Sequence, residues 1–469
     1  MDIHHIIYLT VYFVTIILMF KYSLKYGIIL LGIIVPIHTV SIYLFNFITF
    51  EISTILALTI TFLWSTKMIL SGRIVYRRTY LDKYLFLLIL IYLISSLFAY
   101  NKLISWRGIS AILLNNLLIY FLIVNIVKNE HIFKQVLIGT FIGAIIVSSY
   151  AIYQSLWTYF NYEPRWTFLE WSNNPYMSYG VAYYTEFLSN NLRQVFTRPR
   201  STLGTSNILA GYLLTPLLML ISISFYYFNR KKLFYLILIF ISLIFYSYLH
   251  TFSRAGLGGL FISLIFFTFL NKNILFNKKI LKTLFFITLT LIIFGTLVSF
   301  PFKNVLGRIF EPSGIFITTG DEHNFTSSTY AHQTLAKCAI NMFLSNPLLG
   351  VGYNNYGTAF AIMFDPSMYY MVAHSQYLGI LAETGLLGIL INLLIFYKII
   401  KYTYKTILIT ENTFLKYILK GLLSAYIGIL ASNIVGEFYN YQFVWFFIGL
   451  MMSANIIARN NNLQSSKIS

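Results

Sequence analysis

His374 is the residue whose type and position most favour chemistry in this chain of 469 residues. It lies in the run Ala373-His374-Ser375-Gln376, where a long polar segment meets an apolar stretch of helical length. A neutral imidazole can take a proton from a hydroxyl group. Ser375 is a plausible N-cap for the next helix, whose positive end would favour the neutral imidazole. His374 is therefore a candidate general base, the alternative being a polar residue satisfied by its neighbours.

Three arginines stand at the ends of apolar stretches and could bind an anion: Arg200, Arg254 and Arg308. A guanidinium group offers a planar fork of donors to phosphate and stays charged when partly desolvated. Small residues beside Arg200 and Arg254 would let a lipid-linked diphosphate approach the backbone closely. Arg198 could replace Arg200 in this role, and Asn207 follows in the same segment. Alternatively, these side chains reach toward lipid headgroups.

The composition places these residues in a membrane protein. Hydrophobic residues make up 58% of the chain and charged residues only 10%, whereas soluble domains carry about 25% charged residues. Apolar stretches of about 20 residues predict an all-α polytopic fold with about twelve or thirteen transmembrane helices, the first being short. The predicted spans are residues 5–20, 26–46, 51–70, 83–100, 109–127, 133–157, 203–228, 233–252, 255–271, 280–300, 376–401, 413–434 and 438–458.

The basic residues predict the orientation of these spans. One set of alternate, mostly short loops holds 23 of the 33 lysines and arginines, and the other, far longer set holds 10. By the positive-inside rule the C-terminus is cytoplasmic, and loops 158–202 and 301–373 of one transmembrane domain, 1–469, are extracytoplasmic. The net charge of +19 is explained by this orientation, and no nucleic-acid partner is expected. Cys338 is the only cysteine, which excludes an intrachain disulfide.

The second long loop is expected to contain short helices. Residues 330–343 carry apolar side chains at helical spacing, which predicts an amphipathic helix that ends before Asn346-Pro347. Gly350-Val351-Gly352-Tyr353 then predicts a tight, closely packed turn. Glu383, nine residues after His374, could be a supporting polar anchor. The tryptophans and tyrosines of the first loop suit either stacking on sugar rings or a belt at the membrane interface.

Four motifs in this order resemble those of the bacterial O-antigen ligase and O-antigen polymerase superfamily. They are Arg200-Ser201-Thr202-Leu203-Gly204 with Asn207, Ser253-Arg254-Ala255-Gly256, Asn346-Pro347-Leu348-Leu349-Gly350-Val351-Gly352, and the pattern His-x-x-x-Leu-x-x-x-x-Glu-x-Gly at His374, Leu378, Glu383 and Gly385. The resemblance covers residues 195–395. Three positions depart from the family pattern: Ser375 and Thr205-Ser206 replace an Asn and an Asn-Pro, and Tyr330-Ala331-His332 lacks the usual basic residue.

The resemblance implies a glycosyltransferase of the plasma (inner) membrane of a bacterium, with its active site facing outward. The donor would be a glycan on undecaprenyl diphosphate, and the acceptor a hydroxyl group of a glycan, a lipid or a protein. Arg200, Arg254 and Arg308 would bind the diphosphate, and His374 would be the base of an inverting reaction that needs no metal or cofactor. Ligase and polymerase activity both fit these residues. A lipid-linked-glycan transporter and a membrane scaffold are the competing classes.

Overall fold

The computed structural model describes residues 3–37, 41–44, 48–74, 76–159, 182–186, 194–272, 328–366 and 371–468. The predicted all-α polytopic fold is confirmed, because eight helical segments in this part of the chain are long and apolar enough to cross a membrane. They are α3 (Ile52–Ser71), the continuous segment Lys102–Ile126, α7 (Glu130–Tyr159), α8 (Ser206–Tyr226), α9 (Lys231–His250), α16 (Gln376–Ile409), α17 (Thr413–Ser432) and α18 (Gln442–Ile468).

Shorter helices complete the described part of the bundle. The segment Lys102–Ile126 consists of α5 (Lys102–Ala111), a π-helical turn η1 (Ile112–Leu117) and α6 (Leu118–Ile126). The remaining helices are α1 (Ile3–Lys21), α2 (Lys25–Ile34), α4 (Asp82–Leu97), α10 (Arg254–Leu270), α14 (Ser328–Ser345) and α15 (Tyr356–Met363). Two of these, α2 and α10, are apolar but shorter than a full span.

The predicted span at 26–46 is wrong in its second half. Helix α2 ends at Ile34, and strand β1 (Ser41–Leu44) pairs with β2 (Ile48–Glu51) in an antiparallel hairpin with Ser41 opposite Glu51. Pro36 explains the break, because proline disfavours a helical conformation in the residue before it and cannot donate a helical hydrogen bond. The other predicted spans coincide with helices, except for 280–300, which lies outside the described residues.

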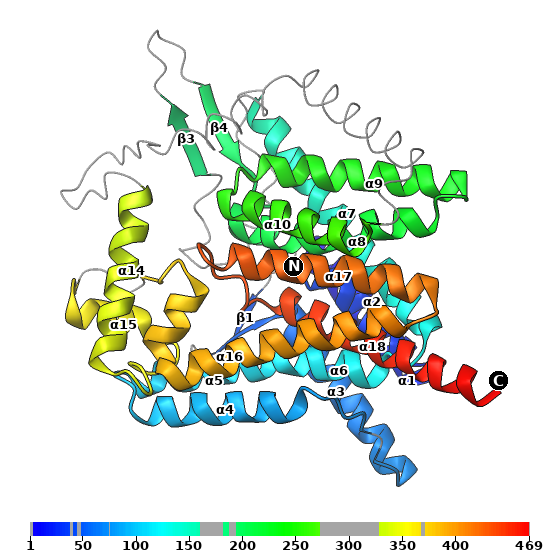
Figure 1. Ribbon diagram of the computed structural model, residues 1–469, viewed down its shortest axis with the longest axis horizontal. Coiled ribbons are helices and arrows are strands. Elements are labelled where there is room, and N and C mark those ends of the chain that lie inside the picture. The colour runs from blue at the N-terminus through cyan, green and yellow to red at the C-terminus, as the bar shows by residue number, and fades with distance from the viewer. Residues whose placement is uncertain are drawn as a thin grey trace.

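A second hairpin occupies part of the predicted first outer loop. Strand β3 (Ala182–Glu186) pairs with β4 (Gln194–Arg198) in antiparallel register, with Ala182 opposite Arg198. Most of the remainder of residues 158–202 lies outside the described part of the chain, as do residues 301–327 of the second loop. The hairpin precedes α8 and lies at the same end of the bundle as the start of α10 (Figure 1).

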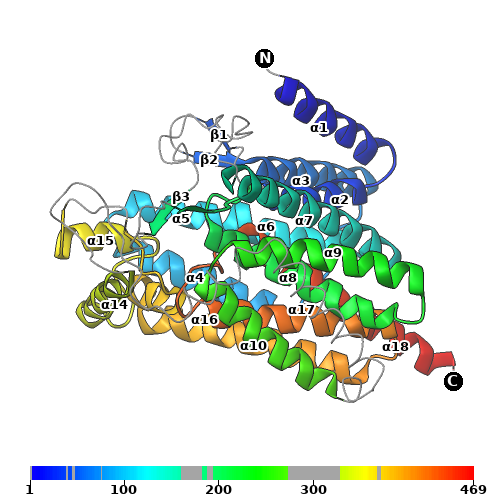
Figure 2. The same ribbon diagram turned by 90° about the horizontal axis from the view of Figure 1, so that it is seen from above.

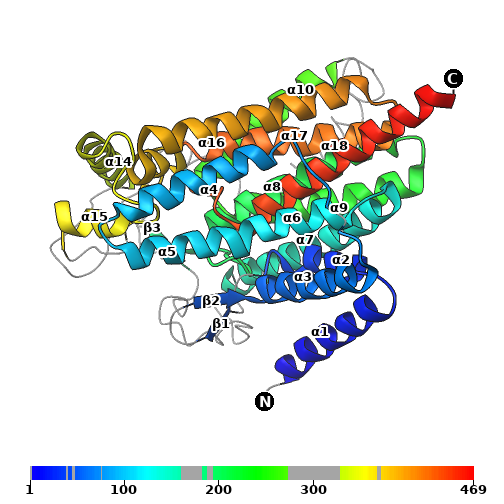
Figure 3. The ribbon, with the colours of Figure 1, turned by 90° about the horizontal axis from the view of Figure 1, so that it is seen from below.

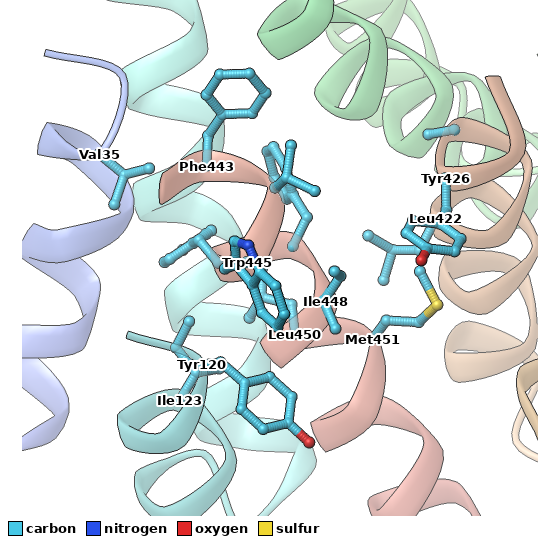
Figure 4. Close-up of a cluster of buried hydrophobic side chains, with 14 of the residues drawn as sticks. Val35, Tyr120, Ile123, Leu422, Tyr426, Phe443, Trp445, Ile448, Leu450 and Met451 are labelled. Atoms are coloured by element: carbon cyan, nitrogen blue, oxygen red, sulfur yellow. The ribbon is translucent and has the colours of Figure 1, made fainter. Parts of the chain in front are cut away.

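Three helices form the centre of the bundle. The apolar windows of α8, α17 and α18 are 83%, 72% and 89% buried, whereas those of α3 and α9 are only 33% buried and face outward. Trp445 on α18 is fully buried, in an apolar cluster that also contains Val35, just after α2, and side chains of α6 and α17 (Figure 4). Its indole N–H donates to the carbonyl of Tyr439 at 3.0 Å, so the ring is satisfied without water.

The basic residues gather at one end of the bundle. There Arg77 Nη1 donates to the carbonyl of Val127 at 3.1 Å, and Tyr80 Oη donates to the carbonyl of Lys398 at 2.8 Å. Arg459 Nε donates to Thr406 Oγ1 at 2.8 Å, which ties α18 to α16 at the same end. Helices α14 and α15 lie at the opposite end (Figures 1, 2 and 3). The uneven charge in the sequence thus corresponds to two chemically different ends of the bundle.

Candidate functional site

Arg254 begins α10 at the end of the bundle that carries α14. The hydroxyl of Ser253 caps α10 by accepting the N–H of Gly256 at 3.1 Å, and Phe252 before it has a positive φ of 47°. Tyr248 Oη donates to the carbonyl of Gly256, which links the end of α9 to the start of α10. The Arg254 side chain is exposed. The sharp α9–α10 turn therefore presents this guanidinium at the surface of the bundle end.

Helix α14 is the predicted amphipathic loop helix, and its existence is confirmed. Leu335, Ala339 and Met342 are buried, and the helix ends at Ser345, immediately before Asn346-Pro347. Near its start, His332 lies with its ring centroid 4.9 Å from that of His374, at an interplanar angle of 63°. Packing of the apolar face of α14 thus places one histidine against the other.

The two histidines and Arg254 form one electrostatic group, which we call the His–Arg cluster (Arg254, His332 and His374). Burial, and then the positive charge of Arg254, lower the pKa of His332. Partial burial, and then His332, lower the pKa of His374, although its imidazole keeps an exposed surface. Both imidazoles are therefore biased toward the neutral form, which can accept a proton.

His374 has an unusual backbone conformation. Its φ is +50°, a left-handed value that costs a residue with a side chain about 1–2 kcal/mol. Ser375 occupies the N-cap position of α16 as predicted, but its side chain makes no capping hydrogen bond. The N–H of Gln376 instead donates to the carbonyls of Asn433 and Gly436, at 3.0 and 2.9 Å. The start of α16 is thus held by the turn between α17 and α18.

Glu437, in that turn, is a contact of His374 that the sequence analysis missed. The backbone N–H of His374 donates to its carboxylate, and burial raises the pKa of Glu437 to about 7. The side-chain carbonyl of Asn433 accepts the N–H of Phe438 at 2.8 Å and fixes the turn from the other side. The available signal was an acidic residue at the junction of two long apolar stretches, where a charge is costly.

Glu383 anchors the segment behind the cluster. Its carboxylate accepts the backbone N–H groups of Tyr356, at 3.0 Å, and of Asn354. Its carbonyl accepts the N–H of Gly352 at 3.0 Å. These bonds join α15 and the turn before it to α16. Glu383 is therefore a structural anchor of this turn, and its supporting role at the site stays a prediction.

A break in α16 makes room for this turn. Gly385 has φ 62° and ψ −159°, which is not helical, and the N–H of Leu386 donates to the carbonyl of Pro347 at 2.8 Å. The predicted tight turn is confirmed, with φ values of 68° at Gly350 and 107° at Gly352. A Cβ atom on Gly350 would lie 2.3 Å from the backbone of Glu383. Gly350 and Gly385, which belong to two different motifs, therefore let the backbone of the turn pack directly against the backbone of α16.

Asn355 fastens the same turn to α5. The side chain is fully buried, and its Oδ1 accepts the N–H of Asn101 at 2.8 Å. Its Nδ2 lies within hydrogen-bond distance of Ser105 Oγ at 2.7 Å, of the Tyr353 carbonyl at 3.1 Å and of the Asn101 carbonyl at 3.2 Å. One amide thus joins the start of α5 to the segment that leads into α15.

Arg200 and Asn207 flank the N-terminus of α8. The backbone N–H groups of Arg200 and Ser201 donate to Gln154 Oε1, at 3.2 and 2.8 Å, and Ser201 has a φ of 51°. Thr205 caps α8 by accepting the N–H of Ile208 at 3.2 Å. Arg200 is half-buried and Asn207 is exposed. The sequence Thr205-Ser206 thus starts the helix with a side-chain cap.

The starts of α8 and α10 lie side by side. A Cβ atom on Gly256 would lie 2.7 Å from the Cβ of Ala210, one turn into α8. The segment with Arg200 and Asn207 is therefore a neighbour of the segment with Arg254. Arg198 belongs to β4, and Arg308 lies outside the described residues.

As for metals, no group of three or more His, Cys, Asp or Glu side chains in the described ranges is arranged to hold an ion.

The fold and the cluster define a class: a polytopic membrane protein with titratable groups and an arginine gathered at one end of its helical bundle. Residues 239–393 match the family model Wzy_C, described as O-antigen ligase, and this range contains Arg254, His332, His374 and Glu383. This segment of the chain is thus similar to O-antigen ligases, in agreement with the resemblance of the motifs. No curated protein matches it. The match supports glycan transfer of the ligase or polymerase type.

Proposed function

We propose that the protein transfers a glycan from undecaprenyl diphosphate to an acceptor hydroxyl group at the outer face of the bacterial plasma (inner) membrane. The observation that carries this proposal is the His–Arg cluster, in which a group suited to bind diphosphate lies next to a neutral pair of imidazoles. Both an O-antigen ligase and an exopolysaccharide polymerase would use this chemistry, because they share the donor and differ in the acceptor.

His374 is the general base in this proposal. Its imidazole takes the proton of the acceptor hydroxyl while the hydroxyl oxygen attacks the anomeric carbon of the donor sugar. The bond from that carbon to the diphosphate oxygen breaks, and its electron pair leaves with the diphosphate. Attack opposite the leaving group inverts the configuration at the anomeric carbon. The exposed surface of His374 then lets the proton pass to solvent.

Arg254 stabilises the leaving group. Negative charge grows on the diphosphate as the sugar departs, and a fixed guanidinium is most effective against a charge that develops in the transition state. Arg200, at the neighbouring start of α8, is the second proposed diphosphate ligand, with Arg308 as the third. Arg254 also lowers the pKa of His332, which favours its neutral form. When His374 takes up the proton of the acceptor, its neighbour His332 is therefore not already charged.

The two ends of the bundle support the proposed orientation of the site. The end rich in lysine and arginine is cytoplasmic by the positive-inside rule, so the His–Arg cluster at the opposite end faces outward. The C-terminus is then cytoplasmic, and loops 158–202 and 301–373 are extracytoplasmic. An outward site suits a lipid-linked donor, whose glycan lies outside the hydrocarbon core of the bilayer.

The decisive experiment uses purified protein, a synthetic undecaprenyl-diphosphate glycan and candidate acceptors, with release of undecaprenyl diphosphate as the readout. His374→Ala should lower transfer by about 10²–10⁴-fold while the donor still binds. Near-normal transfer by His374→Ala, with loss in His332→Ala, would move the base to α14. Normal transfer by both variants would refute a histidine base, and the molecule that receives the glycan distinguishes ligase from polymerase.

A second set of variants tests the diphosphate contact. Arg254→Lys should transfer poorly, because an ammonium group cannot make the paired hydrogen bonds of a guanidinium. Arg230→Lys is the matched control, since Arg230 is an exposed arginine at the basic end of the bundle. Full activity in both Arg254→Lys and Arg254→Ala would show that Arg254 only contacts lipid headgroups. Movement of the donor across the membrane without its cleavage would indicate a transporter.

A further inference from the structure

Glu437 lies where it can control the conformation of His374. Its carboxylate accepts the backbone N–H of His374, the residue with the left-handed φ of +50°. A side chain attached to a left-handed residue leaves the chain in a direction that an ordinary helical or extended backbone would not give it. The contact with Glu437 therefore bears on where the imidazole points.

The residues that follow His374 are held by the same part of the chain. The N–H of Gln376 donates to the carbonyls of Asn433 and Gly436, and Tyr377 Oη donates to the carbonyl of Leu430 at 2.7 Å. The end of α17 and the turn after it thus contact three of the four residues from His374 to Tyr377, two through the backbone and Tyr377 through its side chain. Two side chains of the turn take part: Glu437 accepts the backbone N–H of His374, and Asn440 Oδ1 accepts Gln376 Nε2 at 3.5 Å.

The surroundings of Glu437 indicate a role as a hydrogen-bond acceptor. Its negative charge acts on Tyr356 of α15, on Glu383 of α16 and on Tyr441, which immediately precedes α18. Burial raises its pKa to about 7, so the group is partly protonated near neutral pH. A backbone N–H needs an acceptor oxygen, which both the charged and the neutral carboxyl group provide.

We propose that Glu437 is a positioning residue for the general base: its side-chain oxygen holds the left-handed backbone of His374 and so directs the imidazole toward His332 and the acceptor hydroxyl. The proposal rests on the assignment of His374 as the base. Glu437 lies outside the segment that matches the O-antigen ligase family model, so its role is read from the contacts of this chain alone.

Two variants of equal side-chain length provide the test. Glu437→Gln keeps an acceptor oxygen, and Glu437→Met fills the same space with a thioether that accepts hydrogen bonds only weakly. In the transfer assay, with activity normalised to protein recovered as a monodisperse species, we expect Glu437→Met to lower kcat about tenfold, as loss of one oriented hydrogen bond would. The KM for the donor should stay within about twofold, because the diphosphate contacts of Arg254 are untouched, and Glu437→Gln should keep most of the wild-type kcat.

Glu411→Gln and Glu411→Met serve as controls, because Glu411 is exposed at the other end of α17. An unchanged kcat in Glu437→Met would overturn the positioning role, and so would a loss in Glu437→Gln as large as that in Glu437→Met. If Glu437→Met is not recovered, the kcat of Glu437→Gln alone decides the question, since a tenfold loss there contradicts a need for an acceptor only.

His374→Ala is measured in the same assay to keep the two proposals apart. An active His374→Ala would remove the base itself and leave nothing for Glu437 to position. An inactive His374→Ala together with a fully active Glu437→Met would leave the base in place and refute only the role of Glu437.

Discussion

Gly385, at the break in α16, permits a sharp prediction about stability. Its φ of 62° and ψ of −159° belong to a region that is essentially restricted to glycine. A Cβ atom at this position would lie 2.4 Å from the carbonyl carbon and 2.5 Å from the carbonyl oxygen of Leu348. Both are backbone atoms, so a side-chain rotation cannot relieve the overlap.

The expected cost of Gly385→Ala has two parts. The backbone strain is about 1–3 kcal/mol. Separation of the two segments also weakens the hydrogen bonds from Leu386 to Pro347 and from Leu387 to Leu348, each worth about 0.5–1.5 kcal/mol. Together these give a loss of about 2–6 kcal/mol, a large share of the roughly 5–15 kcal/mol that stabilises a typical folded domain.

Thermal unfolding of the detergent-purified protein is the assay, and Gly379→Ala is the matched control. Gly379 lies in the same helix, and a Cβ atom there would meet only the Cβ of Ala373 at 3.6 Å, an ordinary contact. Alanine is also the better helix former, by about 1 kcal/mol. We expect a clearly lower melting temperature for Gly385→Ala and an equal or higher one for Gly379→Ala. Equal melting temperatures for the two variants would refute the argument that the break requires glycine.

Three further predictions concern the site, the anchor of its turn and the topology. Because the pKa of His374 is lowered and the base must be neutral, transfer should persist into mildly acidic pH and fall only below the ordinary histidine value of 6.5; a pH profile of kcat/KM with a midpoint above 6.5 would contradict this. Asn355→Ala should destabilise the protein by about 2–4 kcal/mol, measured by denaturation, because several buried hydrogen-bond partners lose the amide; an unchanged stability would show that the network is dispensable. In a Cys338→Ala background, a cysteine at exposed Gln333 should react with an impermeant thiol reagent in intact cells, after any outer membrane has been permeabilised, whereas one at exposed Lys405 should react only after lysis; the reverse pattern would invert the topology.

Helix α14 shows what the sequence could predict about the site. Apolar side chains at helical spacing and the Asn346-Pro347 stop gave both the helix and its end, because these signals are local. The grouping of Arg254 with His374 was a hypothesis from the motifs. In the structure the charge of Arg254 lowers the pKa of His332, whose ring lies against that of His374. Arg308 remains a prediction, because it lies outside the described residues.

Glu437 shows what could not be predicted from the residues alone. Its partner is a backbone N–H, which every non-proline residue offers, so no pair of side chains in the sequence indicated the contact.

The predicted span at 26–46 was wrong in its second half because it rested on hydrophobicity. Hydrophobicity alone does not distinguish a membrane helix from a helix followed by an apolar hairpin, and Pro36 decided between them.

The contacts between His374 and the turn before α18 also have a consequence for the order in which the site is completed during synthesis. A polypeptide is made from its N-terminus, so Arg254, His332 and His374 leave the ribosome before the turn that contains Glu437. A nascent chain that has inserted only as far as α16 carries these three groups but lacks the backbone contacts that hold the imidazole. With His374 as the proposed base, we expect the activity to begin only when the last two helices are complete, so that unfinished chains already in the membrane would consume little of the proposed lipid-linked donor.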